Sequence, residues 1–274
     1  MNNDVFRALV DALERGETAA LVTVVSTRGS TPQRTGAKML VFADGRTVGT
    51  IGGGCYEHDA FGKARSAIRL RRPQLAQYDL NDDVAEESGL ICGGHMEIYI
   101  EPVEPSPHLY IIGAGHISLF LARFASETGF RLHVVDDREK YANAERFPGA
   151  DEIVVDSIPG WLEHADLRPG GYGVIVTRGH RHDLEALRIL CTRELRYLGM
   201  IGSRAKVKQV IGTLLSEGVP TEALARVHAP IGLDIGGVTP AEIAVSILAE
   251  LIAVRNGRID DPRVRALSLR LEEG

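Results

Sequence analysis

The second half of the chain alternates short apolar runs with amphipathic stretches, and this alternation constrains the fold more than any other feature. Apolar runs typical of strands lie at residues 109–112, 131–135, 152–155, 173–177 and 197–201. Helical spacing lies at residues 183–195, 205–215 and 241–254. Repeated strand, helix, strand with short turns predicts a parallel sheet that helices cover on both faces. We therefore predict a Rossmann-like, doubly wound α/β domain.

A proline-containing segment separates this region from the first half of the chain. Three prolines alternate with polar residues in the segment 101–107. Such a segment stays extended and resists both a helix and a central strand. We therefore predict two domains, residues 1–104 and 105–274. The first domain contains two helical patterns and two apolar strands with a polar loop between them at residues 27–36, so we expect a mixed α/β domain there.

Composition narrows the class of protein. The chain has 274 residues, 44% of them hydrophobic, and a formal net charge of −6. This balance predicts a soluble globular protein and gives no broad basic field for nucleic acid. We expect no membrane partner and a cytoplasmic location, because the chain has no run of about 18 apolar residues and no basic-then-apolar leader at its N-terminus. The three cysteines are too few for a disulfide framework, so we expect reduced thiols.

A glycine turn opens the second domain. Gly113-Ala114-Gly115-His116 follows the first strand and precedes a helix, and Asp136 lies 21 residues after Gly115. Free amides and the positive helix terminus suit a diphosphate, and a carboxylate after the second strand suits a ribose hydroxyl. The pattern favours an NAD-like over an NADP-like dinucleotide. The alternative is a Rossmann-type domain that uses the turn for another phosphorylated ligand or for none.

Two other segments of this domain end strands with polar residues. Gly202-Ser203-Arg204 is a second candidate anion site, with ordinary helix capping by Ser203 as the alternative. His180 and His182 follow the strand at residues 173–177, where open α/β sheets bind ligands. They are candidate acids, bases or metal ligands, and the alternative is a pair of exposed histidines beside a helix cap.

Cysteine marks the candidate site of the first domain. Cys55 follows Gly52-Gly53-Gly54 at a predicted helix start, a position that lowers the pKa of a thiol. Such a thiolate suits a soft metal or sulfur transfer, and the alternative is a small buried cysteine beside a turn. Cys92 lies in a similar turn. Together with His58 and His95 the two cysteines supply the residue types of a Cys₂His₂ zinc site, but their spacing is not that of a known zinc finger.

The polar loop of the first domain carries hydroxyl and cationic side chains close together. They are Ser30, Thr31, Arg34 and Lys38. Hydroxyl donors beside an arginine suit a phosphate or a carboxylate. The alternative is a solvated loop.

These motifs together resemble the XdhC/CoxI family, the accessory factors that mature molybdenum hydroxylases such as xanthine dehydrogenase. In the first domain the resemblance is carried by residues 25–32, by Gly52-Gly53-Gly54-Cys55-Tyr56-Glu57 and by Cys92-Gly93-Gly94. In the second it is carried by residues 113–116, 136–138, 177–180, 199–204 and 230–244. The resemblance covers nearly the whole chain.

The resemblance implies a cofactor-binding chaperone more than a turnover enzyme. Such a protein binds molybdenum cofactor, supports exchange of an oxo for a sulfido ligand with a cysteine desulfurase as sulfur donor, and delivers the product to the apo-hydroxylase. It also implies a homodimer. Because molybdopterin carries a phosphate and a dithiolene, we expect Gly52 to Cys55 and the loop from Ser30 to Lys38 to form its cradle, with Cys55 as the metal-proximal thiolate and Cys92 as a second candidate.

Two other classes of function remain open from the sequence. One is an NAD-dependent oxidoreductase of unknown substrate, with His180 or His182 as acid or base and Asp136 on the ribose. The other is a regulatory or scaffold protein that uses the dinucleotide fold for assembly. The resemblance assigns no role to His58 or His95.

Overall fold

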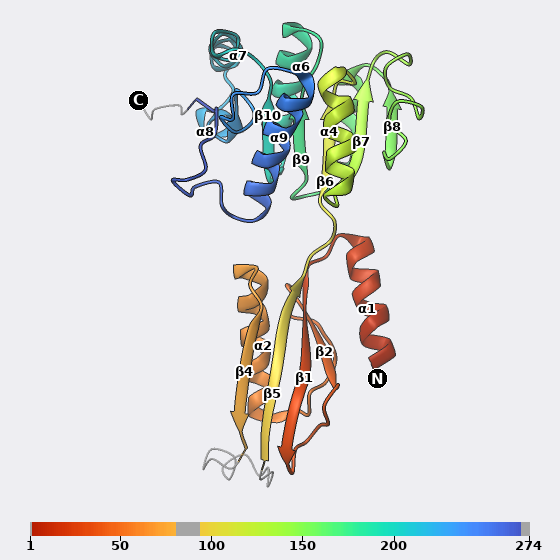
Figure 1. The fold of residues 1–274 in the computed structure, drawn as a ribbon, viewed down its shortest axis with the longest axis vertical. Coiled ribbons are helices and arrows are strands. Elements are labelled where there is room, and N and C mark those ends of the chain that lie inside the picture. Colours follow the sequence, from red (N-terminus) through yellow and green to blue (C-terminus); the bar gives the residue numbers. More distant parts are fainter. Residues whose placement is uncertain (1, 81–93, 270–274) are drawn as a thin grey trace. The chain divides into compact units, whose positions relative to one another are not determined.

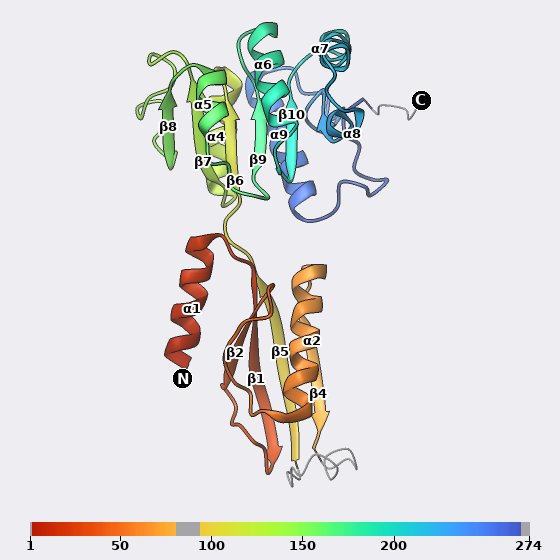
Figure 2. The ribbon, with the colours of Figure 1, turned by 180° about the vertical axis from the view of Figure 1, so that it is seen from behind.

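The computed structural model describes residues 2–80 and 94–269, and the chain divides into two compact units, Met1–Ser106 and Pro107–Gly274 (Figures 1 and 2). The division lies inside the proline-containing segment 101–107. Each unit has its own sheet and its own hydrophobic core. In the described ranges, no helix is both long and apolar enough to cross a membrane.

Within the described residues, the first unit is a five-stranded antiparallel sheet with the order β3-β2-β1-β5-β4. Its strands are β1 (Ala19–Gly29), β2 (Lys38–Phe42), β3 (Thr47–Gly49), β4 (Gln74–Asp79) and β5 (Gly94–Val103). Its helices are α1 (Asn2–Arg15) and α2 (Gly54–Leu70).

The two helices of this unit cover opposite faces of the sheet. Successive side chains of a strand point to opposite faces, so neighbouring residues of β1 pack against different helices. Ala20 and Val22 of β1 share a core with Ala60 and Ala64 of α2. Ala19 belongs instead to the smaller core under α1. α2 is therefore a platform fixed on one face of the sheet, and Figure 2 shows that face.

The first strand is longer than the sequence predicted. The sequence predicts a polar loop at residues 27–36, but β1 continues to Gly29 and pairs with β5 as far as Gly94. A register shift between Val24 and Ser26 marks an irregularity in this pairing. The end of β1 is set by its backbone pairing with the long strand β5. The residues at this end are polar, so the sequence shows no apolar alternation from which the strand could be predicted.

The second unit contains a parallel sheet, six-stranded in its described residues, with the order β11-β10-β9-β6-β7-β8. Its strands are β6 (His108–Ile112), β7 (Arg131–Asp136), β8 (Glu152–Val155), β9 (Tyr172–Ile175), β10 (Tyr197–Met200) and β11 (Val227–His228). In chain order this arrangement is 3-2-1-4-5-6 read from β8, the doubly wound order of the Rossmann fold. The predicted fold class is confirmed. The direction in which successive strands are added to the sheet reverses between β6 and β9, and such sheets bind ligands at this point.

Helices cover both faces of this sheet. They are α4 (His116–Glu127), α5 (Ile158–His164), α6 (His180–Leu190), α7 (Arg204–Ser216), α8 (Thr221–Ala225) and α9 (Pro240–Arg255). α4 and α9 share one core, and α5, α6 and α7 share the other. The helix predicted at 183–195 begins three residues earlier and ends at Leu190, because Gly179 starts it directly after the β9 turn. This brings His180 and His182 into its first turn.

Candidate functional site

Three successive glycines at the start of α2 form a turn that only glycine adopts easily. Gly52, Gly53 and Gly54 have φ values of 129°, 78° and 79°. A Cβ on Gly52 would lie 2.8 Å from the Cβ of Pro32, so the missing side chain lets the loop at residues 30–34 approach the turn. Cys55 follows in the first turn of α2 with an exposed side chain. The turn and the loop are therefore neighbours.

The loop residues differ in how they are held. Ser30 and Arg34 are exposed, while the Thr31 hydroxyl donates to the carbonyl of Gln33 at 2.9 Å. Lys38 does not join them, because its ammonium donates to Thr23 at 2.9 Å and lies 5.7 Å from the ring centre of Phe6. Phe6 belongs to α1, on the opposite face of the sheet from α2. Of the four predicted donors, Lys38 thus lies on the α1 face of the sheet.

Glu57 occupies the amides of the glycine turn, and the sequence reasoning missed this residue. Its Oε2 accepts from the amides of Ile51, Gly52 and Gly53 at 2.9, 3.1 and 3.0 Å, and from the Thr50 hydroxyl at 2.5 Å. Burial raises the pKa of Glu57, but these donors lower it by more, so the net pKa lies below the ordinary 4.5. The sequence contains a signal for this contact, because an acidic residue in the first turn of a helix favours the free amides at the helix start.

Removing the Glu57 carboxylate is expected to loosen the turn. The Glu57→Ala variant should lose about 1–3 kcal/mol of unfolding free energy at pH 7, because four donors lose one charged acceptor. Since the pKa of Glu57 is lowered on folding, its contribution is present above pH 4.5 and is lost as the pH falls through the folded pKa. Urea unfolding at pH 7 and at lower pH measures this. The exposed Glu14→Ala on α1 is the control, and a difference between wild type and Glu57→Ala that stays constant with pH would contradict the assignment.

The histidines beside the cysteines do not form a metal cluster in the described residues. His58 lies exposed on α2, and His95 on β5 pairs with Asp79, with 3.5 Å between Nδ1 and Oδ2. Across residues 2–80 and 94–269, no three or more His, Cys, Asp or Glu side chains are placed to share a metal ion. Cys92 lies outside the described residues, so its predicted role stays a prediction.

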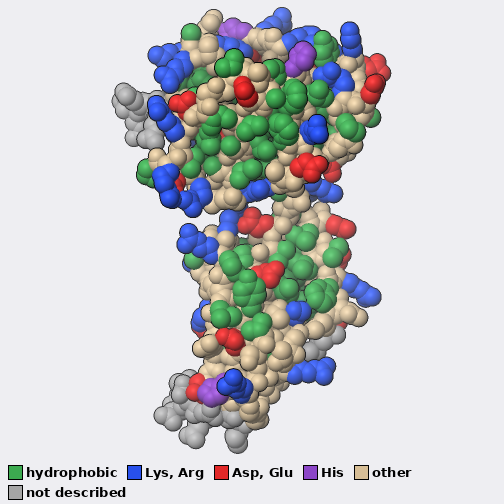
Figure 3. Space-filling model, viewed as in Figure 1, with side chains coloured by type: hydrophobic (Ala, Val, Ile, Leu, Met, Phe, Trp, Pro, Cys, Tyr) green, Lys and Arg blue, Asp and Glu red, His purple; other side chains and the backbone are tan. Residues whose placement is uncertain are grey.

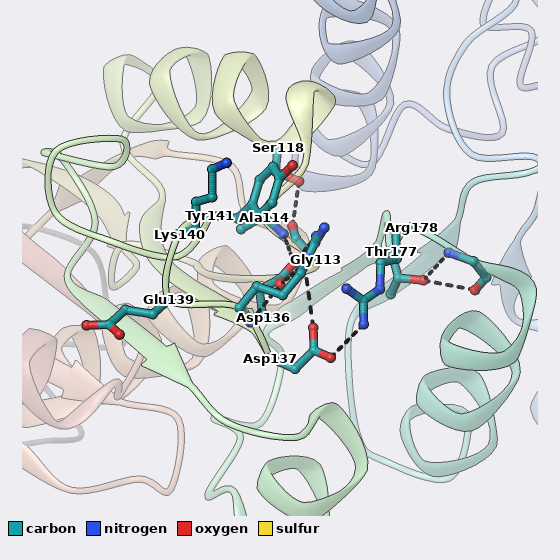
Figure 4. Close-up of polar contacts among 12 residues, drawn as sticks. Gly113, Ala114, Ser118, Asp136, Asp137, Glu139, Lys140, Tyr141, Thr177 and Arg178 are labelled. Carbon is teal, nitrogen blue, oxygen red and sulfur yellow. Dashed lines mark hydrogen bonds and ion pairs between the residues drawn. The ribbon is translucent and has the colours of Figure 1, made fainter.

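In the second unit, the glycine turn after β6 depends on close backbone packing. Gly113 has a φ of 105°, and a Cβ there would lie 2.7 Å from the carbonyl oxygen of Val176 and 2.8 Å from the Cα of Thr177. Gly115 is the N-cap of α4, and a Cβ there would meet nothing within 4 Å. Ser118 is buried and donates to the Gly113 carbonyl at 2.5 Å. Figure 4 shows this turn beside the ends of β7 and β9.

Asp136 is engaged by the protein itself. Its carboxylate accepts from the Ala114 amide at 2.7 Å and from three donors of Arg138: the amide at 3.1 Å, Nε at 2.8 Å and Nη2 at 2.9 Å (Figure 4). Burial raises the pKa of Asp136, but Arg138 and the Ala114 amide lower it by more. Arg138 also lies 4.0 Å from the ring centre of Tyr141. Asp136 therefore braces the glycine turn, and its expected ribose contact stays a prediction.

Polar residues that follow β7, β9 and β10 lie at the same edge of the sheet. Arg178 pairs with Asp137 at 2.8 Å. The Thr177 hydroxyl donates to the fully buried Asp183 at 2.6 Å, and Lys206 of α7 pairs with the other oxygen of Asp183. These contacts tie the ends of β7, β9 and β10 together.

The second candidate anion turn is a helix cap in this structure. The Ser203 side chain accepts from the Lys206 amide at 3.3 Å and so caps α7. Arg204 is exposed in the first turn, and Gly202 precedes it with partial exposure. His116 is exposed at the start of α4. The predicted ligand roles of these residues remain predictions.

The fold and these two glycine turns define a two-unit protein with a Rossmann domain. Residues 12–79 match the model of the XdhC and CoxI family, and residues 109–251 match that of the XdhC Rossmann domain. The chain belongs to the XdhC and CoxI family, which confirms the resemblance found in the sequence.

Individual relatives cover most of the chain. It is 38% identical over 86% of its length to the uncharacterized protein YqeB of Escherichia coli K12, and spans 43% of that relative. It is 27% identical to a probable xanthine dehydrogenase subunit of Bacillus subtilis 168, covering 91% of this chain and 97% of the relative. It is 23% identical to the molybdenum cofactor insertion chaperone PaoD of Escherichia coli K12, covering 94% and 90%. A solved xanthine dehydrogenase structure from Bacillus halodurans is 26% identical, with a TM-score of 0.52 over 94% of this chain and 98% of that one.

Proposed function

We propose that this protein is an accessory factor for a molybdenum hydroxylase of the xanthine dehydrogenase type. It binds molybdenum cofactor, supports its sulfuration with a cysteine desulfurase as sulfur donor, and delivers it to the apo-enzyme. Family membership supports this role, as does the similarity over most of the chain to a protein named as a molybdenum cofactor insertion chaperone. The observation that carries the proposal is the exposed thiol of Cys55 beside a pre-formed glycine turn.

In this proposal Cys55 is the metal-proximal thiolate. Its exposed position at the start of α2 makes it accessible to a bulky cofactor, whereas Cys191 is buried and burial raises the pKa of the Cys191 thiol. Pro32, in the loop that carries Ser30, Thr31 and Arg34, lies against the same turn, and the exposed Ser30 hydroxyl and Arg34 guanidinium are the donors that this proposal assigns to the cofactor. The glycines shape the turn, and Glu57 holds their amides in place.

The second unit contributes a Rossmann domain whose ligand is also part of the proposal. Gly115 leaves open space at the start of α4, which suits the approach of a dinucleotide phosphate. The engagement of Asp136 by Arg138 favours the accessory role over an NAD-dependent oxidoreductase, since the carboxylate that would select NAD already accepts four protein donors. A dinucleotide form of the molybdenum cofactor would use the same turn.

A homodimer and a cytoplasmic location belong to the same proposal. Apolar side chains gather over α4 and α9 on the face that Figure 3 shows. Val245 of α9 is 46% exposed. A contiguous apolar patch of this kind is typical of an interface, and a second copy of this chain would cover it. Mass determination in solution at several concentrations tests this, and a monomer at every concentration would contradict it.

Anaerobic incubation with molybdenum cofactor tests the function itself. After removal of free cofactor, the purified full chain should retain molybdenum by elemental analysis, and the loaded protein should activate an apo-hydroxylase. A parallel titration with NAD by calorimetry tests the oxidoreductase alternative. Binding of NAD without retention of molybdenum would overturn the accessory role.

A further inference from the structure

One face of α2 carries a stripe of residues that begins at Cys55. Cys55, His58, Gly62, Arg65 and Arg69 are spaced by three and four residues in turn, so they lie along a single side of the helix. The buried side of α2 carries a different set: Tyr56, Ala60, Ala64 and Ala67. The stripe is therefore not needed to hold the helix on the sheet.

A groove follows this stripe. A hollow of about 640 Å³ lies here, and the residues that line it include His58, Phe61, Gly62, Arg65, Ser66 and Arg69. Gly62 gives the groove part of its depth, because a Cβ there would meet no atom within 4 Å. Phe61 is partly buried against the core, so it offers an aromatic surface at a fixed place. All of these residues belong to the first unit.

The charge of the groove is positive and uncompensated. Among the described residues, Arg65 and Arg69 form no ion pair and no hydrogen bond with another side chain, whereas their neighbour Lys63 pairs with Asp59. A guanidinium with free donors binds a phosphate in bidentate fashion. The two arginines lie one helical turn apart, so both reach one phosphate group or its two sides.

The glycine turn is a poor alternative for that phosphate. The amides of Gly52 and Gly53, which would normally bind an anion at a helix start, already donate to the Glu57 carboxylate. A second anion would have to displace Glu57 or lie beside its negative charge. The cationic groove further along α2 has no such competitor among the described residues.

We propose that the α2 groove binds the phosphorylated pterin end of the molybdenum cofactor. This inference rests on the proposed function and adds the place and chemistry of a subsite. Gly62 and Phe61 would lie against the flat ring of the pterin, and Arg65 and Arg69 would hold its phosphate.

Fluorescence titration of the full chain tests the subsite without molybdenum. The probes are the oxidised, metal-free phosphorylated pterin prepared from the cofactor and the same pterin after phosphatase treatment. Wild type should bind the phosphorylated probe roughly tenfold or more tightly than the dephosphorylated one, since charged hydrogen bonds are at stake. The double variant Arg65→Gln/Arg69→Gln should lose this preference and bind both probes alike. Inorganic phosphate should compete only for wild type.

Two further variants distinguish binding in the groove from nonspecific attraction to the positive charges of the protein. Gly62→Leu fills the hollow and should weaken both probes, while its exposed helical position and higher helix propensity keep the fold intact. Arg7→Gln removes a cation from α1, on the other face of the sheet, and should change neither affinity. An unchanged phosphate preference in the double variant, or an equal loss in Arg7→Gln, would overturn the subsite.

The same protein samples distinguish this inference from the proposed function. Wild type that retains molybdenum while the double variant keeps its phosphate preference refutes the groove and leaves the accessory role standing. A phosphate preference that wild type shows and the double variant lacks supports the groove. If that wild type still retains no molybdenum, the accessory role fails and the groove remains as a site for a phosphorylated heterocycle.

Discussion

Replacing Cys55 with serine is expected to reduce retained molybdenum to background and to abolish activation of the apo-hydroxylase. Serine keeps the size of the side chain but replaces a soft thiolate with a hard hydroxyl that stays protonated at neutral pH. Because Cys55 is exposed in the first turn of α2, the unfolding free energy should change by no more than about 0.5 kcal/mol. Elemental analysis of the loaded protein and urea unfolding measure the two effects.

A second cysteine offers the matched control for this experiment. Cys191 is buried at 4% exposure in the other unit, and burial raises its thiol pKa. Cys191→Ala should therefore leave molybdenum retention unchanged, although a small loss of stability is expected from the deleted core atom. If Cys55→Ser retains molybdenum and activates the hydroxylase as wild type does, Cys55 is not the metal-proximal group.

The second unit was predictable because its signal is local and repeated. Most of its strands are short apolar runs, several of them followed by a helical pattern, and both periods can be read within a few residues of sequence. The order of the strands is a different matter. It follows from the handedness of each crossover and from the point between β6 and β9 where the direction of strand addition reverses, and no single segment of sequence contains this information. β11, with two residues, is too short to show any periodicity.

The first unit was harder to predict because its pairing is long-range. β1 lies between β2 and β5, and the partner residues Ala19 and Val103 are far apart in the sequence. The apolar alternation within β1 shows that it is a strand but does not identify its neighbours. For the same reason the strand end at Gly29 was placed too early, since it depends on β5 rather than on its own side chains.

For the candidate sites too, the sequence predicts where a residue lies but not which groups it contacts. The sequence located Cys55 at a helix start and Asp136 at a strand end, and the structure places both there. It did not reveal that Glu57 fills the glycine amides or that Arg138 engages Asp136. Those contacts depend on rotamers and on turn geometry, so a motif identifies the residues of a turn but not whether their hydrogen-bonding groups are free.

A buried carboxylate in the second unit carries the largest expected effect on stability. Glu250 of α9 is fully buried. Its Oε2 accepts from the Tyr197 hydroxyl at 2.5 Å and from the Gly232 amide at 2.6 Å, and its Oε1 lies 2.9 Å from Nδ1 of His228. Burial and the neighbouring Glu250 carboxylate together raise the pKa of Tyr197 well above its ordinary value, so the Tyr197 hydroxyl stays protonated and donates. Glu250 thus joins α9 to the edge of the sheet.

Glu250→Ala is expected to lower the unfolding free energy by about 3–5 kcal/mol, because it leaves a buried amide and a buried hydroxyl without their acceptor beside a new cavity. Glu250→Gln should lose far less. Its carbonyl oxygen accepts from Tyr197 and Gly232, and its amide donates to His228 once that ring takes the other tautomer. Urea unfolding at pH 7 measures both variants, with Glu194→Ala as the exposed control. Equal losses for the alanine and glutamine variants would show that the negative charge, rather than satisfied hydrogen bonding, holds α9 in place.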